Sequence, residues 1–431
     1  MKIFIFAFLT LGAYVAADDK VVCYYNSKAF FRDGQGKFDV NFIDPALQFC
    51  THLIYGYAGI NPETFKAQPL NELFDVTRDN YRHITELKRR FPGLRVLLSV
   101  GGGEDIGDDG NIKYRTILES VDHRLAFVNS AQALVKNFGF DGLDLSWEFP
   151  ETKPKKIRGK ISSFFSNLKH KIVGESVIDE KAEEHKEQFT ALVREIRNAF
   201  RHDGLLLTMT VLPNVNSSVY YDPRALAPNL DFITLEAFDF YTPKRNPKEA
   251  DYPAPLYELI DRKYDENVDY QVRYWLQKGA PNNKLILGIP TYGRAWKMDE
   301  DSAISGVPPL SIDGPYEAGP YSKEEGLLSY PEVCVKLANP QKLTTAAGKH
   351  LRKVGDPSKR KGTYAFRTPD ENGEGGAWVG YEDPDTAGNK ASYAKAKGLG
   401  GVAIVDITLD DFRGLCTGDK YPILRAAKFR L

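Results

Sequence analysis

The 431-residue sequence has little that points to a metal or a cofactor. Its seven histidines include no close pair at metal-ligand spacing, and its four cysteines are too scattered for a zinc site. No glycine-rich phosphate loop follows the first predicted strand, which argues against a dinucleotide-binding enzyme. We therefore expect no metal ligands and no cofactor.

An excess of charge of one sign is also absent. The chain has 57 Lys and Arg against 58 Asp and Glu, which gives a formal net charge of -1. Such a balance provides no overall attraction to nucleic acid or to an anionic membrane, so we expect neither as a partner. The pattern offers no symmetric seam either, and we expect a monomer.

Long apolar runs are missing except at the start of the chain. One lysine precedes an apolar run at residues 3–11, and Val15-Ala16-Ala17 comes before two acids. This pattern is typical of a secretory signal peptide at residues 1–17. The alternative is a membrane anchor, but the run is shorter than the roughly 20 residues that span a bilayer. We expect a soluble extracellular protein with no membrane insertion.

The cysteines are few but even in number, which in a secreted protein predicts two disulfides. Three pairings are possible; Cys23 and Cys50 are the near pair, which leaves Cys334 with Cys416. One glycosylation sequon occurs, at Asn216, after a strand-like run and a proline. We expect it on an exposed loop that carries an N-linked glycan.

Short β-rich runs recur along the chain and alternate with amphipathic helical patterns. The runs are residues 21–25, 52–57, 94–100, 140–147, 205–211, 231–238, 284–289 and 401–406. Near-continuous apolar strands separated by helices argue for a parallel sheet covered by helices. Eight such units predict an α/β fold of the (β/α)8, or TIM barrel, type. A doubly wound open sheet is the alternative.

Two segments break this rhythm and define the domains. Residues 18–290 and 367–431 are predicted to supply the barrel. Residues 291–366 are too long for a βα unit and are rich in Gly, Pro, Tyr and Ser. They are predicted to form a small α+β domain inserted between the seventh and eighth strands. Residues 151–182, after the fourth strand, form an extra insertion near the barrel mouth.

The extra insertion has an uneven charge. Seven Lys and Arg lie between Lys153 and Lys171, and an acidic run follows. One interpretation is a surface helix whose charges face water. The other is a basic docking patch for a receptor or an acidic glycan.

The stretch DGLDLSWEFP, residues 141–150, ends the fourth predicted strand. Side chains alternate along a strand, so Asp144, Ser146 and Glu148 share one face. Active sites of such barrels lie at the carboxyl ends of the strands. The two acids and the serine between them are therefore candidates for a hydrolytic site, intact or altered.

Several stretches carry a resemblance to a known family. They are CTHLIYGYA (50–58), LLSVGG (97–102), FDGLDLSWEFP (140–150), ALAPNLDFITL (225–235), KLILGIPTYGRAW (284–296), WVGYEDP (378–384) and KGLGGVAI (397–404). Over nearly all of its predicted mature length the chain resembles the family 18 glycoside hydrolases, the chitinases. Its extra insertion and altered catalytic motif are similar to those of the insect imaginal disc growth factors, which are secreted chitinase-like proteins.

The resemblance implies roles for the strand-four residues. In this family the N-acetyl oxygen of the substrate attacks the anomeric carbon, an exception to the two-carboxylate scheme. Glu148 matches the acid that protonates the leaving oxygen, Asp144 matches the inner supporting aspartate, and Asp141 matches the start of the motif. Ser146 stands where the family has the aspartate that orients the acetamido group. A serine hydroxyl is neutral and cannot offset the positive charge that develops.

The strand-six motif is altered too. Phe238 replaces the tyrosine of the family and Glu236 its methionine, while Asp239 is kept. Val405 and Gly103 replace two tryptophans, which removes aromatic faces that grip sugar rings. We interpret six residues as vestigial rather than catalytic: Asp141, Asp144, Ser146, Glu148, Phe238 and Asp239.

Some side chains could still contact a carbohydrate such as a chitin oligosaccharide. These candidates are Trp147, Glu148, Tyr292, Arg294 and Trp378. We expect Asp239 to brace the site by hydrogen bonding, and Arg294 to contact a ligand or to pair with a nearby acid.

The magnitudes favour an inactive protein. Losing one preorganised stabiliser of transition-state charge costs on the order of 3 kcal/mol, roughly a hundred- to thousandfold in rate. The resemblance to the growth factors then implies a secreted signalling protein that acts on an unknown cell-surface receptor or glycan. A lectin for N-acetylglucosamine glycans and a weakly active chitinase are the alternatives.

Overall fold

The computed structural model describes residues 19–105, 111–152, 179–298, 305–337, 350–369 and 375–431. The predicted signal peptide at residues 1–17 and most of the predicted insertion at 151–182 lie outside the described residues. Within the described residues, no helix is both long enough and apolar enough to cross a membrane.

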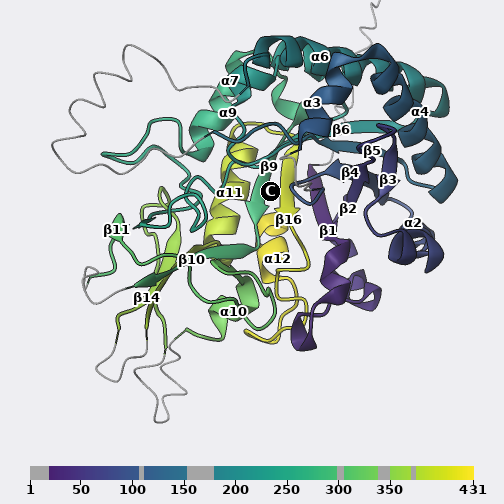
Figure 1. Cartoon of the computed structure of the whole chain (residues 1–431). Helices are drawn as coiled ribbons and strands as arrows, with labels where there is room; N and C mark the ends of the chain where they lie inside the picture. The colour runs from purple at the N-terminus through teal and green to yellow at the C-terminus, as the bar shows by residue number, and fades with distance from the viewer. Residues whose placement is uncertain (1–18, 106–110, 153–178, 299–304, 338–349, 370–374) are drawn as a thin grey trace, which may run out of the picture.

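Eight parallel strands form a closed barrel (Figure 1). They are β1 (Lys20–Asn26), β2 (His52–Ile60), β4 (Arg95–Gly101), β5 (Gly142–Ser146), β6 (Leu206–Val211), β7 (Ile233–Leu235), β9 (Leu285–Pro290) and β16 (Gly401–Val405). Strand β1 pairs in parallel with both β2 and β16, which closes the sheet. The barrel prediction is confirmed, and the open-sheet alternative is wrong.

Helices cover the outside of the barrel (Figure 1). They are α1 (Asp44–Leu47), α2 (Asn80–Thr85), α3 (Ile112–Glu119), α4 (Val121–Phe138), α6 (Ala182–Phe200), α7 (Ser217–Tyr220), α8 (Pro223–Leu226), α9 (Val268–Gln277), α11 (Pro384–Ala396) and α12 (Pro422–Arg430). Helix α4 begins where the Ser120 side chain accepts a hydrogen bond from the His123 N–H, and it ends at Gly139 with a left-handed φ of 74°. Such signals at both ends define a helix without help from tertiary contacts.

The two faces of the barrel strands build two separate apolar cores. Outward-facing side chains join the helices in the main core. A smaller cluster fills the inside of the barrel: Val22, Tyr24, Ile54, Leu97, Phe232, Ile286 and Ala403. Side chains therefore fill the barrel interior around this cluster. Space for a ligand is left at the carboxyl ends of the strands.

A second sheet forms the inserted domain (Figure 1). Its strands are β10 (Tyr292–Met298), β12 (Leu327–Ser329), β13 (Arg352–Val354), β14 (Thr363–Arg367) and β15 (Gly376–Tyr381), and α10 (Tyr330–Cys334) follows β12. Strand β15 pairs with both β10 and β14. The sheet thus continues to Tyr381, whereas the sequence placed the end of this domain at residue 366. That boundary was wrong because β14 and β15 are adjacent strands of one sheet.

Short antiparallel pairs complete the fold. Strand β3 (Ala67–Pro69) pairs with the end of β2, and β8 (Glu249–Ala250) pairs with β11 (Leu310–Ser311).

Both predicted disulfides are present. Cys23 is bonded to Cys50 and Cys334 to Cys416, with Cα atoms 5.9 Å and 5.8 Å apart, ordinary spans for a disulfide. The first joins β1 to the start of β2, and the second joins α10 to the segment after β16. The inserted domain is in this way covalently tied to the end of the barrel.

Candidate functional site

Strand β5 presents two kinds of side chain to its two sides. Leu143, Leu145 and Trp147 belong to the main core outside the barrel. Asp144 and Ser146 are fully buried on the inner face and bond to each other there, as the alternation of strand side chains requires.

Asp144 is the centre of a ring of hydroxyl groups. Its Oδ2 accepts hydrogen bonds from Ser99 Oγ at 2.8 Å, from Ser146 Oγ at 3.0 Å and from Thr210 Oγ1 at 3.0 Å. Its Oδ1 accepts one from Thr208 Oγ1 at 2.7 Å. Burial raises the pKa of Asp144, and these hydroxyl donors oppose that rise. The ring contains hydroxyls and a single carboxyl group, so it holds at most one negative charge.

Ser146 is committed to this ring. Its hydroxyl lies 2.9 Å from Ser99 Oγ and donates to Asp144. Its carbonyl accepts a hydrogen bond from the Gly102 N–H at 2.9 Å. This approach requires glycine at position 101, where φ is 99° and a Cβ would lie 2.2 Å from the Ser146 carbonyl oxygen. The hydroxyl and the carbonyl of Ser146 are therefore already hydrogen-bonded within the protein.

Glu148 is held by the segment that follows β4. Its Oε1 accepts hydrogen bonds from the N–H groups of Gly103 at 3.0 Å and Asp105 at 3.3 Å, and its Oε2 accepts one from the Asn111 side chain. Burial, followed by the charge of Asp105, raises the pKa of Glu148 to about 7. Burial therefore favours the protonated form of Glu148, and both oxygens accept hydrogen bonds from the protein.

Asp105 anchors the segment that holds Glu148. Its carboxylate accepts hydrogen bonds from Lys113 Nζ at 2.7 Å, Tyr114 Oη at 2.8 Å and the Ile60 N–H at 2.8 Å. The Lys113 and Asp105 side chains are both more than nine-tenths buried. Sequence reasoning missed Asp105 and Asn111, because a loop has no periodicity that shows where its side chains point.

The opposite rim of the barrel mouth is held by charge. Asp239 accepts two hydrogen bonds from Arg294, from Nε at 2.9 Å and from Nη2 at 2.6 Å, and one from Tyr292 Oη at 2.8 Å. Arg294 thus pairs with an acid, and Asp239 has the hydrogen bonds expected of a bracing residue, while a ligand contact by Arg294 stays a prediction. Phe238 is buried beside them, with its ring 6.3 Å from that of Tyr292 and perpendicular to it.

Glu236 lies near the same rim and is buried among other acids. Burial raises its pKa well above the ordinary value, and the neighbouring Asp144, Asp239 and Asp406 raise it further. Burial and the neighbouring acids therefore favour the protonated form of this side chain.

Comparisons with known proteins show which family the chain belongs to. The model described as Glycosyl hydrolases family 18 matches residues 20–410. Chitinase-like protein Idgf4 of Glossina morsitans morsitans is 55% identical over 420 residues, which cover 96% of this chain and 95% of that protein. The chain belongs to glycosyl hydrolase family 18. Within the family it groups with the insect chitinase-like imaginal disc growth factors.

Solved family 18 structures share the whole fold. Catalytic domain 2 of the Group II chitinase of Ostrinia furnacalis has a TM-score of 0.79 at 32% identity, with 96% of each chain covered. Human YKL-39, described as a pseudo-chitinase with retained chitooligosaccharide binding properties, has a TM-score of 0.74 at 30% identity, covering 96% of this chain and 99% of that one.

Two predicted sugar contacts of this family 18 chain are wrong. Trp147 is fully buried outside the barrel, where its ring lies 4.9 Å from Tyr114 and 5.6 Å from Phe127. Trp378 is fully buried in the inserted domain, with its ring 5.6 Å from Trp296. Neither indole is exposed to a ligand.

Asp141 is also remote from the barrel mouth. It precedes β5, at the amino end of the strand, where its Oδ2 accepts a hydrogen bond from the Val96 N–H at 2.8 Å. Its Oδ1 lies 3.1 Å from Lys88 Nζ. Asp141, the first residue of the family motif, thus connects β4 to β5 at the end of the barrel opposite its mouth.

The residues that replace the two family tryptophans differ in their surroundings. Val405 packs against the cluster inside the barrel. At Gly103 a Cβ would meet no atom of the described residues within 4 Å.

One group of potential metal ligands occurs among the described residues, Cys334, Asp411 and Cys416. Its two cysteines form a disulfide and therefore offer no thiolate to a metal ion.

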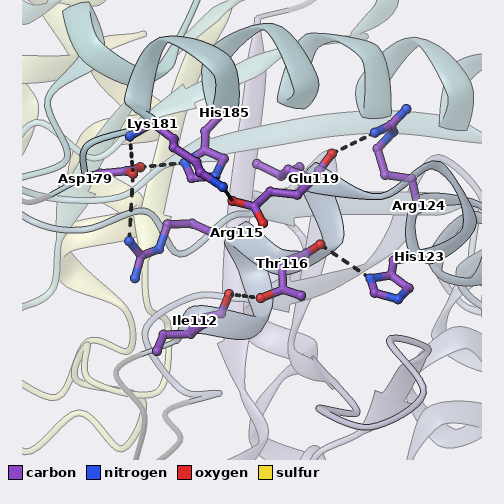
Figure 2. Close-up of polar contacts among 10 residues, drawn as sticks. Ile112, Arg115, Thr116, Glu119, His123, Arg124, Asp179, Lys181 and His185 are labelled. Atoms are coloured by element: carbon purple, nitrogen blue, oxygen red, sulfur yellow. Dashed lines mark hydrogen bonds and ion pairs between the residues drawn. The ribbon is translucent and has the colours of Figure 1, made fainter.

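A separate polar cluster borders residues 153–178 (Figure 2). His185 of α6 lies with Nδ1 2.7 Å from Asp179 and Nε2 3.1 Å from Glu119. Lys181 Nζ lies 3.0 Å from Glu119, and Arg115 lies 3.9 Å from Asp179. Charged contacts thus join α3 to residues 179–185 at the start of α6.

Proposed function

We propose that this protein is a secreted chitinase-like protein without chitinase activity that acts as a growth factor or signalling protein. The observation that carries the proposal is the hydroxyl at position 146. A carboxylate there would face the cationic ring that forms during substrate-assisted cleavage. The Ser146 hydroxyl instead donates to Asp144 and offers no negative charge.

Two further features support the loss of activity. A general acid must give its proton to the leaving oxygen, yet both Glu148 oxygens accept hydrogen bonds from the protein. Phe238 has no hydroxyl to bond the acetamido group, and both Asp239 oxygens are taken by Arg294 and Tyr292.

Restoring the family residues tests this account. We expect Ser146→Asp combined with Phe238→Tyr to raise turnover of a fluorogenic chito-oligosaccharide at least about tenfold, because each group stabilises transition-state charge. The matched control combines Ser146→Asn with Phe238→Tyr, since an amide has a similar shape but no charge. An equal gain in both double variants would contradict the role of charge.

The signalling part of the proposal draws on the growth-factor relatives. Its test is the proliferative response of cultured insect cells to purified protein. The response should persist in Glu148→Gln, because the proposal needs no catalysis. Deleting residues 153–171 then asks whether the basic insertion is the effector. An undiminished response would assign signalling to another surface.

Binding of chito-oligosaccharides is the second candidate function. It is favoured by the similarity to human YKL-39, a pseudo-chitinase with retained chitooligosaccharide binding properties. The space beside Gly103, which no described residue fills, also favours it. Titration calorimetry with chitotetraose at millimolar concentration should then give heat that disappears when Tyr57, whose ring packs on Gly102, is changed to alanine. Absence of heat in the unaltered protein would remove this candidate.

A further inference from the structure

A groove of about 470 Å³ lies outside the barrel between β6, β7 and α9. In Figure 1 the labels α7 and α9 mark this side of the molecule. The strand residues that line the groove include Val211, Leu235 and Ala237, which belong to the outer core rather than to the cluster inside the barrel. Of the barrel-mouth residues described above, only Glu236 also lines the groove, so the groove lies beside that site and mostly outside it. Its volume lies within the roughly 300–1,000 Å³ of small-ligand pockets.

The acceptor asparagine of the sequon lines this groove. Asn216 caps α7, with Oδ1 accepting hydrogen bonds from the Ser218 N–H at 3.0 Å and from Ser218 Oγ at 2.7 Å. Ser217 Oγ accepts a hydrogen bond from Trp275 Nε1 at 3.1 Å, which ties the sequon to α9. These contacts use the oxygen of the Asn216 amide and orient its nitrogen, the atom to which a sugar is attached.

The walls of the groove suit an amino sugar. Tyr270 and Tyr274, one turn apart on α9, line it together with Tyr264, which is 62% exposed. Tyrosine offers an apolar face to the C–H side of a pyranose ring and a hydroxyl to its edge. Glu266 also lines the groove, and its buried Oε2 has no hydrogen-bond partner among the described residues. A hydroxyl or acetamido N–H would satisfy this oxygen.

We propose that an N-linked glycan on Asn216 folds back into this groove and that its innermost N-acetylglucosamine residues lie against the three tyrosines. The occupant follows from the geometry, because the attachment atom belongs to a residue of the groove wall. The glycan then covers aromatic surface that is otherwise open to water. This role is independent of any activity at the barrel mouth.

Enzymatic removal of the glycan from the folded protein tests the proposal. The full chain is secreted from insect cells, and release by peptide N-glycosidase is followed by intact mass under native and denaturing conditions. The control is Asn216→Gln combined with Pro62→Asn, which creates a sequon ahead of Thr64 on an exposed turn. We expect native release from Asn216 to be at least about tenfold slower than from the control. After denaturation the two rates should be equal.

Changes in the groove wall then separate seating from simple crowding. Tyr264→Ala combined with Tyr274→Ala should accelerate native release toward the control rate, while the melting temperature of the unglycosylated protein checks folding. An unmodified Asn216, native release as fast as in the control, or release unaffected by the tyrosine changes would each overturn the proposal. Loss of the proposed signalling function would leave these rates unaltered.

Discussion

The two sides of the barrel mouth, a neutral rim at Glu148 and a charged rim at Asp239, stabilise their acidic side chains in different ways. Glu148 is held by neutral N–H donors, and burial raises its pKa to about 7. Asp239 is held by the guanidinium of Arg294, at 2.6 Å and 2.9 Å, and by a tyrosine hydroxyl. One rim therefore tolerates a carboxyl group by leaving it partly uncharged, and the other by pairing its charge.

The difference shows how a family 18 barrel can hold buried acids in its mouth without a substrate to pair with them. A buried carboxyl group needs hydrogen-bond partners or a counter-charge, and each rim supplies one of these from residues outside β5. Once such partners occupy the oxygens, the catalytic partners are no longer needed for stability. The hydroxyl of Ser146 completes the same arrangement around Asp144.

Breaking the charged rim should have the largest effect. Arg294→Gln leaves the buried Asp239 without its counter-charge and should lower the free energy of unfolding by about 3–5 kcal/mol. Urea denaturation at pH 7 measures this loss. Arg294→Lys, which keeps the charge but not the two-point contact, should cost less. A loss below about 1 kcal/mol for Arg294→Gln would show that the rim does not depend on charge.

Changing Glu148 on the neutral rim should instead increase the free energy of unfolding. The pKa of Glu148 is raised from 4.5 to about 7, so the folded protein holds a proton that the unfolded chain releases. The stability contributed by this group is complete below about pH 4.5 and is lost as the pH rises to about 7. Glu148→Gln cannot ionise, and it should be more stable than the unaltered protein by about 3 kcal/mol at pH 8.

The pH dependence of Glu148→Gln provides its own control. Near pH 4 the two proteins should have nearly equal free energies of unfolding, because both then carry a neutral side chain at this position. Equal stability at both pH values would mean that Glu148 ionises as freely in the folded protein as in water.

The smallest effect is expected at Ser146. Ser146→Ala removes one hydrogen bond to Asp144 and leaves three other hydroxyl donors in place. The cost should be about 1 kcal/mol in the free energy of unfolding, measured by urea denaturation. A loss above about 3 kcal/mol would show that the ring depends on this single hydroxyl.

Much of the fold could be predicted because its signals are local. Each barrel strand is a short apolar run, and α/β alternation with eight such runs allows few other architectures. The inward position of Asp144 and Ser146 follows from strand alternation alone. The same alternation places Trp147 on the outside, so its assignment to the cleft was an avoidable error.

Other features depend on contacts that no local pattern encodes. Trp378 is buried because β15 packs within the second sheet against Trp296, on a strand more than 70 residues away in sequence. The capture of Glu148 by Asn111 and the N–H groups of Gly103 and Asp105 depends on the path of a loop. The groove beside Asn216 likewise exists only once residues 211–218, 235–240 and 263–275, which are separate in sequence, come together.

The central claim is that a family 18 barrel with a hydroxyl at position 146 cannot stabilise the cationic intermediate of substrate-assisted cleavage. The most direct measurement is the kcat/KM of the purified protein on a fluorogenic chitotrioside, beside an active family 18 chitinase under the same conditions. We predict a value lower by at least about a thousandfold, from the loss of charge stabilisation. A value within tenfold of the active enzyme would contradict the account.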